Sequence, residues 1–217
     1  MSYLTQSEIL SELKTGTLGF IPALDVFQLQ PHAIDLRLGF TFLIPRHLTL
    51  TQRGRIALEM DQLSGAATHF DTVELEAGQV FDLLPNESVL VSTLEKIKMP
   101  AYLVGEMFPR SSVNRRGLAV DLSGIVDAGY EGSLIIPVRN NSAFSVVRLY
   151  PGERFCQLTF TRLNTAATVR RSRYHQRDVA IGVLPEQDQE EVNLVRQGAI
   201  DELKATFRVK TEEAGND

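Results

Sequence analysis

Short apolar segments, separated by proline, glycine or asparagine, dominate residues 34–169. They are rich in Val, Ile, Leu, Phe and Thr, which favour β-strands, and no helical periodicity of useful length interrupts them. Residues 46–69 are polar and irregular, which predicts a loop with a short element near 56–60. The pattern predicts an all-β barrel or sandwich. Its strands are expected at 34–44, 79–83, 88–97, 102–107, 118–122, 133–138, 145–149 and 154–161.

Both ends of the chain carry helical signals. Thr5 and Glu8 form a capping box, apolar residues follow at positions 9, 10 and 13, and Gly16 ends the helix. Near the other end, the apolar residues between 192 and 207 predict a helix over about 188–206, weakened by Gly198. We therefore predict a β-domain over 1–184 and a helical C-terminal appendage over 185–217.

The formal charge is unevenly distributed. The appendage holds nine acidic and four basic residues and so carries the whole net charge of −5, because residues 1–184 hold eighteen of each sign. An acidic chain argues against a dedicated nucleic-acid binder, which needs a basic excess. A single cysteine, Cys156, excludes an intramolecular disulfide and a thiolate-rich metal site. No stretch approaches the roughly 18 apolar residues of a membrane span and no signal-peptide pattern is present, so a cytoplasmic protein is expected.

The candidate chemistry lies in residues 108–132. The four histidines are scattered, and one cysteine cannot supply the P-C-x-x-C signature of zinc deaminases. Arg110 beside Ser111 and Ser112 forms a set suited to oxyanions, although an ordinary polar turn explains these residues equally well. Asp127 before a glycine is by itself more typical of a turn than of a catalytic site. Taken together, they suggest a water activated by aspartate next to a phosphate held by arginine.

Four motifs in order along the chain resemble those of the superfamily of trimeric dUTP pyrophosphatases and zinc-independent dCTP deaminases. The motifs are residues 31–39 (PHAIDLRLG), 110–118 (RSSVNRRGL), 126–132 (VDAGYEG) and 151–158 (PGERFCQL). The resemblance covers about residues 3–180. It implies a distorted β-barrel of the β-clip type, assembled as a homotrimer with sites at subunit interfaces. Its ligands would be dUTP or dCTP, bound with Mg²⁺.

The resemblance also implies a role for each matching position. Asp127 would orient the attacking water, and Tyr130 would pack against the deoxyribose. Ile125 belongs to a hairpin whose backbone would pair with the base. In the tail, Arg173 and Tyr174 would cover the triphosphate, and Mg²⁺ would be held through the triphosphate rather than by protein ligands. The residues that would grip the phosphates are Arg110, Ser111, Ser112 and, from a neighbouring subunit, Gln157.

A few positions distinguish hydrolysis of dUTP from deamination of dCTP. In the deaminases a glutamate ten residues after the third-motif aspartate is the general base, and here Pro137 stands there. Asp127 is retained and Tyr130 is typical of the pyrophosphatases, whereas Arg115 matches the deaminases. We predict a Mg²⁺-dependent hydrolase that converts dUTP to dUMP and pyrophosphate, with Asp127 and Arg115 as catalytic residues. The alternatives are a dCTP deaminase forming dUTP and ammonia, and a non-catalytic nucleotide-binding trimer.

Overall fold

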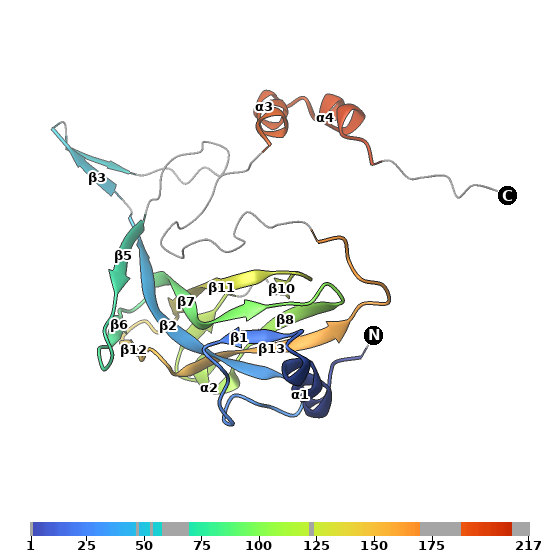
Figure 1. Ribbon diagram of the computed structural model, residues 1–217. Coiled ribbons are helices and arrows are strands. Elements are labelled where there is room, and N and C mark those ends of the chain that lie inside the picture. The colour runs from blue at the N-terminus through green and yellow to red at the C-terminus, as the bar shows by residue number, and fades with distance from the viewer. Residues whose placement is uncertain are drawn as a thin grey trace. The chain divides into compact units, whose positions relative to one another are not determined.

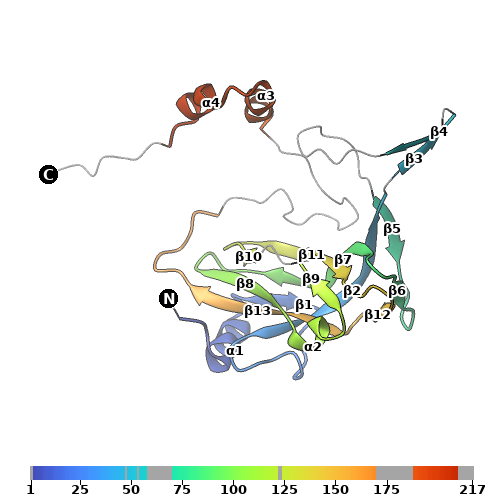
Figure 2. The same cartoon turned by 180° about the vertical axis from the view of Figure 1, so that it is seen from behind.

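The computed structural model describes residues 2–46, 48–52, 54–57, 70–121, 124–169 and 188–209 (Figures 1 and 2). Contacts divide the chain into two units, residues 1–58 with 68–182 and residues 59–67 with 183–217. The boundary that the charge pattern indicates between residues 184 and 185 stays a prediction. No helix in the part of the chain that the structure describes is long and apolar enough to cross a membrane.

The first unit is built on one curled antiparallel sheet (Figure 1). Its strands are β1 (Gly19–Ile21), β2 (Ile34–Pro45), β5 (Phe70–Glu74), β7 (Ser88–Lys98), β8 (Leu103–Pro109), β9 (Leu118–Val120), β10 (Ile125–Val126), β11 (Glu131–Asn140) and β13 (Arg154–Arg162). They pair in the order β10-β8-β13-β2-β7-β11-β9, with β1 added to β7 and β5 added to β2. The mainly β, barrel-like fold that the sequence predicts is confirmed.

Two further strand pairs lie outside this sheet. One joins β6 (Phe81–Leu83) to β12 (Val147–Leu149), and the other joins β3 (Leu48–Thr51) to β4 (Gly54–Ala57). The β3–β4 hairpin corrects the prediction of a loop from residue 46. β3 alternates leucine with threonine, but a pattern of only four residues is too short to distinguish a strand from a loop, and Leu48, Leu50 and Ile56 are all exposed. The element expected near 56–60 falls partly in β4 and partly outside the described residues.

The central strands β2 and β13 contribute many residues to the core. Both are buried over most of their length, although polar residues such as Asp35 and Thr159 are interspersed among the apolar ones. Leu36, Leu158 and Phe160 are fully buried there. The rings of Phe42 and Phe81 stack with centroids 4.6 Å apart and so join the main sheet to the β6–β12 pair.

Gly39 allows a close approach of β2 to β7. A Cβ atom at this position would lie 2.2 Å from the side-chain oxygen of Ser92 and 3.0 Å from the carbonyl oxygens of Ser92 and Thr93. The pairing register of the two strands shifts between Leu38 and Phe42, on either side of this contact. Glycine is therefore required here by space rather than by its backbone angles.

The N-terminal helix α1 (Gln6–Thr15) is fastened to the sheet by a carboxylate. It begins with the predicted capping box, in which the Thr5 amide donates to Glu8 Oε2 at 2.8 Å. On its inner side, the buried Glu12 accepts hydrogen bonds from the Tyr102 hydroxyl (2.6 Å), the Thr17 hydroxyl (2.7 Å) and Arg162 Nη2 (2.7 Å). Burial raises the pKa of Glu12, but these hydrogen bonds outweigh it and hold that pKa below its usual range.

Replacing Glu12 by glutamine is expected to lower the free energy of unfolding by about 1–3 kcal/mol at pH 7, because charged hydrogen bonds are lost in a buried setting. A depressed folded-state pKa adds stability above the unfolded value near 4.5, and this stability is lost as the pH falls through the folded pKa. Urea unfolding at pH 7 and pH 4 measures both effects. The difference in the free energy of unfolding between wild type and Glu12→Gln should be smaller at pH 4 than at pH 7. An unchanged difference would contradict a lowered pKa of Glu12 in the folded protein.

The second unit contains α3 (Gln189–Gln197) and α4 (Ile200–Thr206). Asp188 caps α3 by accepting hydrogen bonds from the amides of Glu190 (3.0 Å) and Glu191 (3.1 Å). Gly198 ends α3 in the left-handed conformation, with φ of 70°. The single helix expected over 188–206 is thus two helices, because Gly198 terminates the first instead of only weakening it.

Candidate functional site

The four sequence motifs occupy strand ends and turns of the first unit. Residues 31–39 enter β2, and residues 151–158 form the turn and first half of β13. The second motif lies where β8 passes into the short helix α2 (Ser111–Asn114), for which Arg110 is the N-terminal capping position. Residues 126–132 form the turn from β10 into β11.

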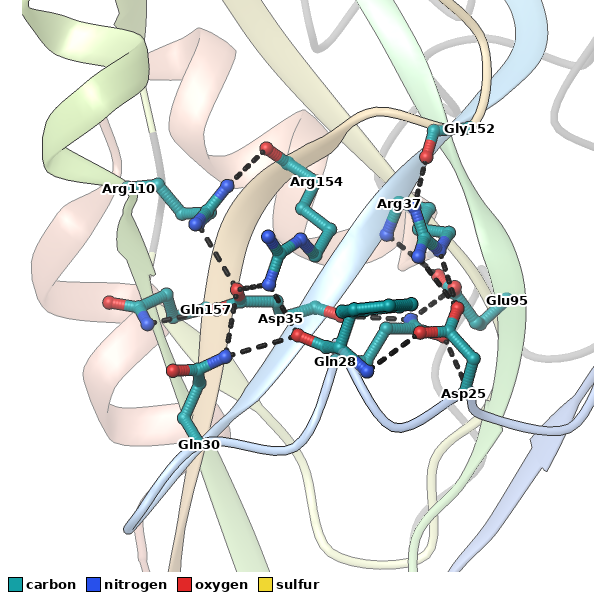
Figure 3. A network of polar contacts seen from close by, with 11 residues as sticks. Asp25, Gln28, Gln30, Asp35, Arg37, Glu95, Arg110, Gly152, Arg154 and Gln157 are labelled. Atoms are coloured by element: carbon teal, nitrogen blue, oxygen red, sulfur yellow. Dashed lines mark hydrogen bonds and ion pairs between the residues drawn. The ribbon is translucent and has the colours of Figure 1, made fainter.

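Asp35 on β2 is the centre of a polar cluster that joins the first, second and fourth motifs (Figure 3). Its carboxylate is fully buried, and Arg110 Nε and Arg154 Nη1 lie 3.1 and 3.2 Å from its Oδ2. Gln157 Nε2 donates to Oδ1 at 2.9 Å, and Gln30 Nε2 donates to Oδ2 at 3.2 Å. One buried carboxylate therefore organises two guanidinium groups and two amides.

Strand register brings these side chains together. In the antiparallel pairing of β13 with β2, Gln157 lies opposite Asp35, so both side chains project on one face. On its other side Gln157 lies opposite Phe108 of β8, two residues before Arg110. The Arg110 backbone N–H donates to the Phe155 carbonyl at 3.2 Å, and its Nη1 donates to the Arg154 carbonyl at 3.1 Å. The backbone thus fixes where Arg110 leaves the sheet.

A second buried carboxylate, Glu95 on β7, supports the first (Figure 3). Gln28 Nε2 donates both to Glu95 Oε1 at 2.7 Å and to the Asp35 carbonyl at 2.9 Å. The Arg37 backbone N–H donates to Glu95 Oε2 at 3.0 Å, and the Arg37 side chain pairs with Asp25 at 2.6 Å. Burial raises the pKa of Glu95, and the hydrogen bonds from Arg37 and Gln28 only partly oppose this.

Cys156 lies inside the sheet beside this cluster. Its thiol is fully buried, and burial together with the charges of Glu95 and Asp35 raises its pKa well above the ordinary value. A buried thiol that stays protonated is a poor nucleophile. Cys156 therefore acts as a small core residue.

The outer surface of the cluster is suited to anions. Arg110 and Arg154 keep 25% and 28% of their side chains exposed, while Asp35 beneath them is 0% exposed. Two positive charges face one negative charge, which leaves an excess of one positive charge at this point. Ser111 and Ser112 are exposed next to Arg110. Guanidinium groups and hydroxyls at one strand end are a set that binds phosphate oxygens.

The third motif lies at a different place in the same chain. Val126 of β10 pairs with Gly105 of β8, whereas Arg110 lies five residues further along, about 17 Å at roughly 3.4 Å per residue. Ile125 and Asp127 are exposed at this distant end. The structure thus brings Arg110, its serines and Gln157 together, but it separates them from Asp127, Ile125 and Tyr130 within one chain.

Tyr130 is held by its own turn. Its hydroxyl donates to the Ser133 carbonyl at 2.7 Å, and its ring packs against the core. Burial raises the pKa of Tyr130 to about 12. The preceding Gly129 has φ of 77°, and a Cβ atom there would lie 2.6 Å from Val169, so the turn also requires glycine for space.

The remaining predicted residues fall in three groups. Arg115 is exposed at the end of α2, close to the Arg110 cluster. Arg173 and Tyr174 lie outside the described residues. Pro137 is exposed on β11, and its carbonyl accepts a hydrogen bond at 2.9 Å from the amide of Asp121, which continues the β9–β11 register by one position. Asp121 and Pro137 are therefore opposite each other with side chains on one face.

Asp35, Arg154 and Gln30 belong to the cluster although no role was predicted for them from the sequence. Asp35 and Arg154 lie inside the first and fourth motifs, where each is a charged residue in a strand that is mostly buried. A charge in a buried strand is costly unless it is paired, and that cost is the signal that marks them. Gln30 carries no comparable signal, since it lies in a polar loop.

No group of three or more His, Cys, Asp or Glu side chains that could hold a metal ion occurs among the residues described. The expectation that the protein supplies no dedicated metal site concerns the whole chain and stays a prediction.

Comparison with known proteins identifies the family. The model of the dCTP deaminase-like family matches residues 3–163. A dUMP-forming dCTP deaminase of Methanobrevibacter smithii is 32% identical over 168 residues, which are 77% of this chain and 84% of that protein. One of Dictyoglomus thermophilum is 36% identical over 166 residues, 76% of this chain and 82% of that protein. The crystal structure of the Agrobacterium tumefaciens dCTP deaminase shares the fold, with a TM-score of 0.55 at 23% identity over 75% of this chain and 49% of that one.

These relatives overturn the prediction that hydrolysis of dUTP is the main reaction. They are named for deamination of dCTP, and several are named as dUMP-forming. The prediction is wrong because it gives Pro137 and Tyr130 more weight than the rest of the matched length. The family model covers the N-terminal helix and the sheet with all four motifs. The chain belongs to the dCTP deaminase-like family.

Proposed function

We propose that this protein binds dCTP and deaminates it. The observation that carries the proposal is the Asp35 cluster, which presents Arg110, Ser111 and Ser112 as an anion-binding surface in a chain whose relatives are named dCTP deaminases. In this reaction water adds to C4 of cytosine and ammonia leaves, so that dCTP and water give dUTP and ammonia. Formation of dUMP would require a second water and release pyrophosphate.

The separation of the motifs supports an active site shared between copies. Arg110 and Gln157 contact the same Asp35 carboxylate within one chain, so we propose that they bind the phosphates from one copy, rather than Gln157 from a neighbouring subunit as the resemblance implies. Asp127 and Tyr130 of a neighbouring copy would face the sugar and base. Ile125 would contribute its backbone to the base, as the hairpin in which it lies does in the family that the chain resembles. An enzyme of deoxynucleotide metabolism assembled in this way would work in the cytoplasm.

A shared site requires an oligomer, and we expect a homotrimer. Light scattering in dilute solution should give three times 24.2 kDa. The exposed Ile125 and Phe27 are apolar positions that an interface would cover. A monomer that turns over dCTP would contradict the shared site.

The proton acceptor must differ from the glutamate of the deaminases, because Pro137 occupies the corresponding position in this chain and proline cannot accept a proton. Asp121 is the carboxylate directly opposite Pro137, on the same face of the sheet, and opposite residues have Cβ atoms roughly 5 Å apart. Its side chain is exposed, which suits a group that exchanges protons with water. Asp121 would take the proton from the attacking water, and Arg115 would stabilise the charge that forms.

Magnesium would enter with the nucleotide. The described residues offer guanidinium groups and hydroxyls rather than a carboxylate cluster, so they fit the phosphates that carry the ion and not the ion itself. When bound, Mg²⁺ would neutralise part of the triphosphate charge. Arg110, Ser111 and Ser112 would orient the remaining oxygens.

Ammonia release from dCTP tests the proposal. Purified full-length protein with Mg²⁺ should release ammonia from dCTP, and CTP should serve as the matched control because it differs only in the 2′-hydroxyl. Binding of dCTP without ammonia would refute deamination and favour a non-catalytic nucleotide-binding protein. Absence of both binding and ammonia would refute the substrate as well.

A further inference from the structure

We propose that Asp35 is a positioning residue that fixes Arg110 and Arg154 as a pair of donors for phosphate oxygens, which makes Arg154 a phosphate-binding residue. The inference deepens the proposed function, since it rests on that function for the nature of the ligand, a nucleoside triphosphate. It assigns roles to two residues that the motif roles leave unassigned.

The hydrogen-bonding directions of the two guanidinium groups support this pairing. Arg110 uses Nε for Asp35 and Nη1 for the Arg154 carbonyl, which leaves Nη2 as a donor for a ligand. Arg154 uses Nη1 for Asp35 and for the Phe27 carbonyl, which leaves Nε and Nη2. A guanidinium group has five N–H donors in a fixed plane, so anchoring one edge sets the direction of the others.

Charge also favours an anion at this position. The two arginines share a single carboxylate oxygen, Asp35 Oδ2, and Asp35 is fully covered by its partners. The neighbouring acidic side chains are engaged elsewhere. Glu153 is paired to Arg116 at 2.9 Å and Asp25 is paired to Arg37, while the buried Glu95 accepts hydrogen bonds from Gln28 and the Arg37 backbone N–H. The excess positive charge is therefore held in a fixed position at the surface, so that binding of an anion requires little rearrangement of the two arginine side chains.

The geometry differs from that of an ordinary structural ion pair elsewhere in the chain. Arg148 and Asp82 form an exposed pair at 2.7 Å between β12 and β6, with one cation for one anion. That pair is balanced in charge, and both side chains are about half exposed, so solvent screens it. It provides a matched control because removal of Arg148 changes the same charge without touching the Asp35 cluster.

Calorimetric binding of inorganic pyrophosphate tests the inference without relying on the reaction. We expect Arg154→Gln to weaken pyrophosphate binding by about tenfold or more, the loss typical of a charged hydrogen bond. Arg154→Lys should recover part of the affinity, because it restores the charge without the planar fork. Asp35→Asn should weaken binding similarly although both arginines remain, and Arg148→Gln should bind like wild type.

Thermal unfolding of each variant separates positioning from folding. Asp35→Asn removes the negative charge between Arg110 and Arg154, which is expected to lower the stability of the fold. If this variant does not fold, the pyrophosphate affinities of Arg154→Gln and Arg154→Lys decide the outcome. Wild-type affinity in Arg154→Gln, or no binding of pyrophosphate by wild type, would overturn the inference. Weakened pyrophosphate binding in the variants together with no ammonia from dCTP would refute the proposed reaction and leave the inference standing. In an active enzyme, Arg154→Gln and Asp35→Asn should raise KM for dCTP more than they lower kcat.

Discussion

Replacing Arg110 by glutamine is expected to lower kcat/KM for dCTP by about 10²–10³-fold. A charged hydrogen bond to a phosphate oxygen is worth about 1.5–3 kcal/mol, which by itself accounts for a loss of about 10–10²-fold in nucleotide binding. The side chain anchors two partners, the Asp35 carboxylate and the Arg154 carbonyl, so its loss also releases the geometry of the cluster. Steady-state kinetics with dCTP, using protein whose unfolding temperature is measured in parallel, gives the answer.

Arg148→Gln is the control for this measurement, because Arg148 pairs only with groups near the exposed β6–β12 edge. Arg110→Lys should fall between wild type and glutamine, since lysine keeps the charge but cannot bridge both partners. Activity in Arg110→Gln equal to wild type would remove the Asp35 cluster from the active site.

Substituting Asp121 by asparagine is expected to lower kcat for deamination by about 10²–10⁴-fold with little change in the affinity for dCTP. The magnitude is that of removing a positioned general base. The physical reason is the register, which sets the carboxylate of Asp121 opposite Pro137 on one face of the sheet. Single-turnover kinetics separates the chemical step from binding.

Glu131 provides the competing assignment, since it is another carboxylate near the third motif and pairs in register with Lys98. Glu131→Gln should retain most of the activity. A large loss in Glu131→Gln with normal turnover in Asp121→Asn would exchange the two roles. Full activity in both variants would show that neither carboxylate accepts the proton.

The sequence predicts a strand well where the strand is long and has one or both of its faces buried. The central strands β2, β7 and β13 are segments of 9 to 12 residues rich in apolar side chains, and the sequence places each of them within a few residues. Among the short strands, β6, β9 and β12 fall within predicted segments, whereas β1, β5 and β10 are missed, because two to five residues carry too little periodicity to distinguish a strand from a loop. The β3–β4 hairpin is missed for a related reason, since each of its strands has only four residues and its apolar residues Leu48, Leu50 and Ile56 are exposed.

The candidate site is predicted in its outer part and missed in its inner part. Arg110 and Gln157 follow from motif positions, and the structure brings them to one carboxylate. Asp35 does not follow, because only the register of β2 with β13 shows that it lies beneath them. The separation of Asp127 from Arg110 is likewise invisible in sequence, since it depends on where β10 pairs along β8.

Chromatographic analysis of dCTP after incubation with the full-length wild-type protein and Mg²⁺ tests most directly whether the protein deaminates dCTP. We expect loss of dCTP, one ammonia for each dCTP consumed, and a uracil deoxynucleotide as product. Arg110→Gln, run alongside, should leave most of the dCTP intact over the same time. Unchanged dCTP in the presence of folded wild-type protein that binds it would show that the protein is not a dCTP deaminase.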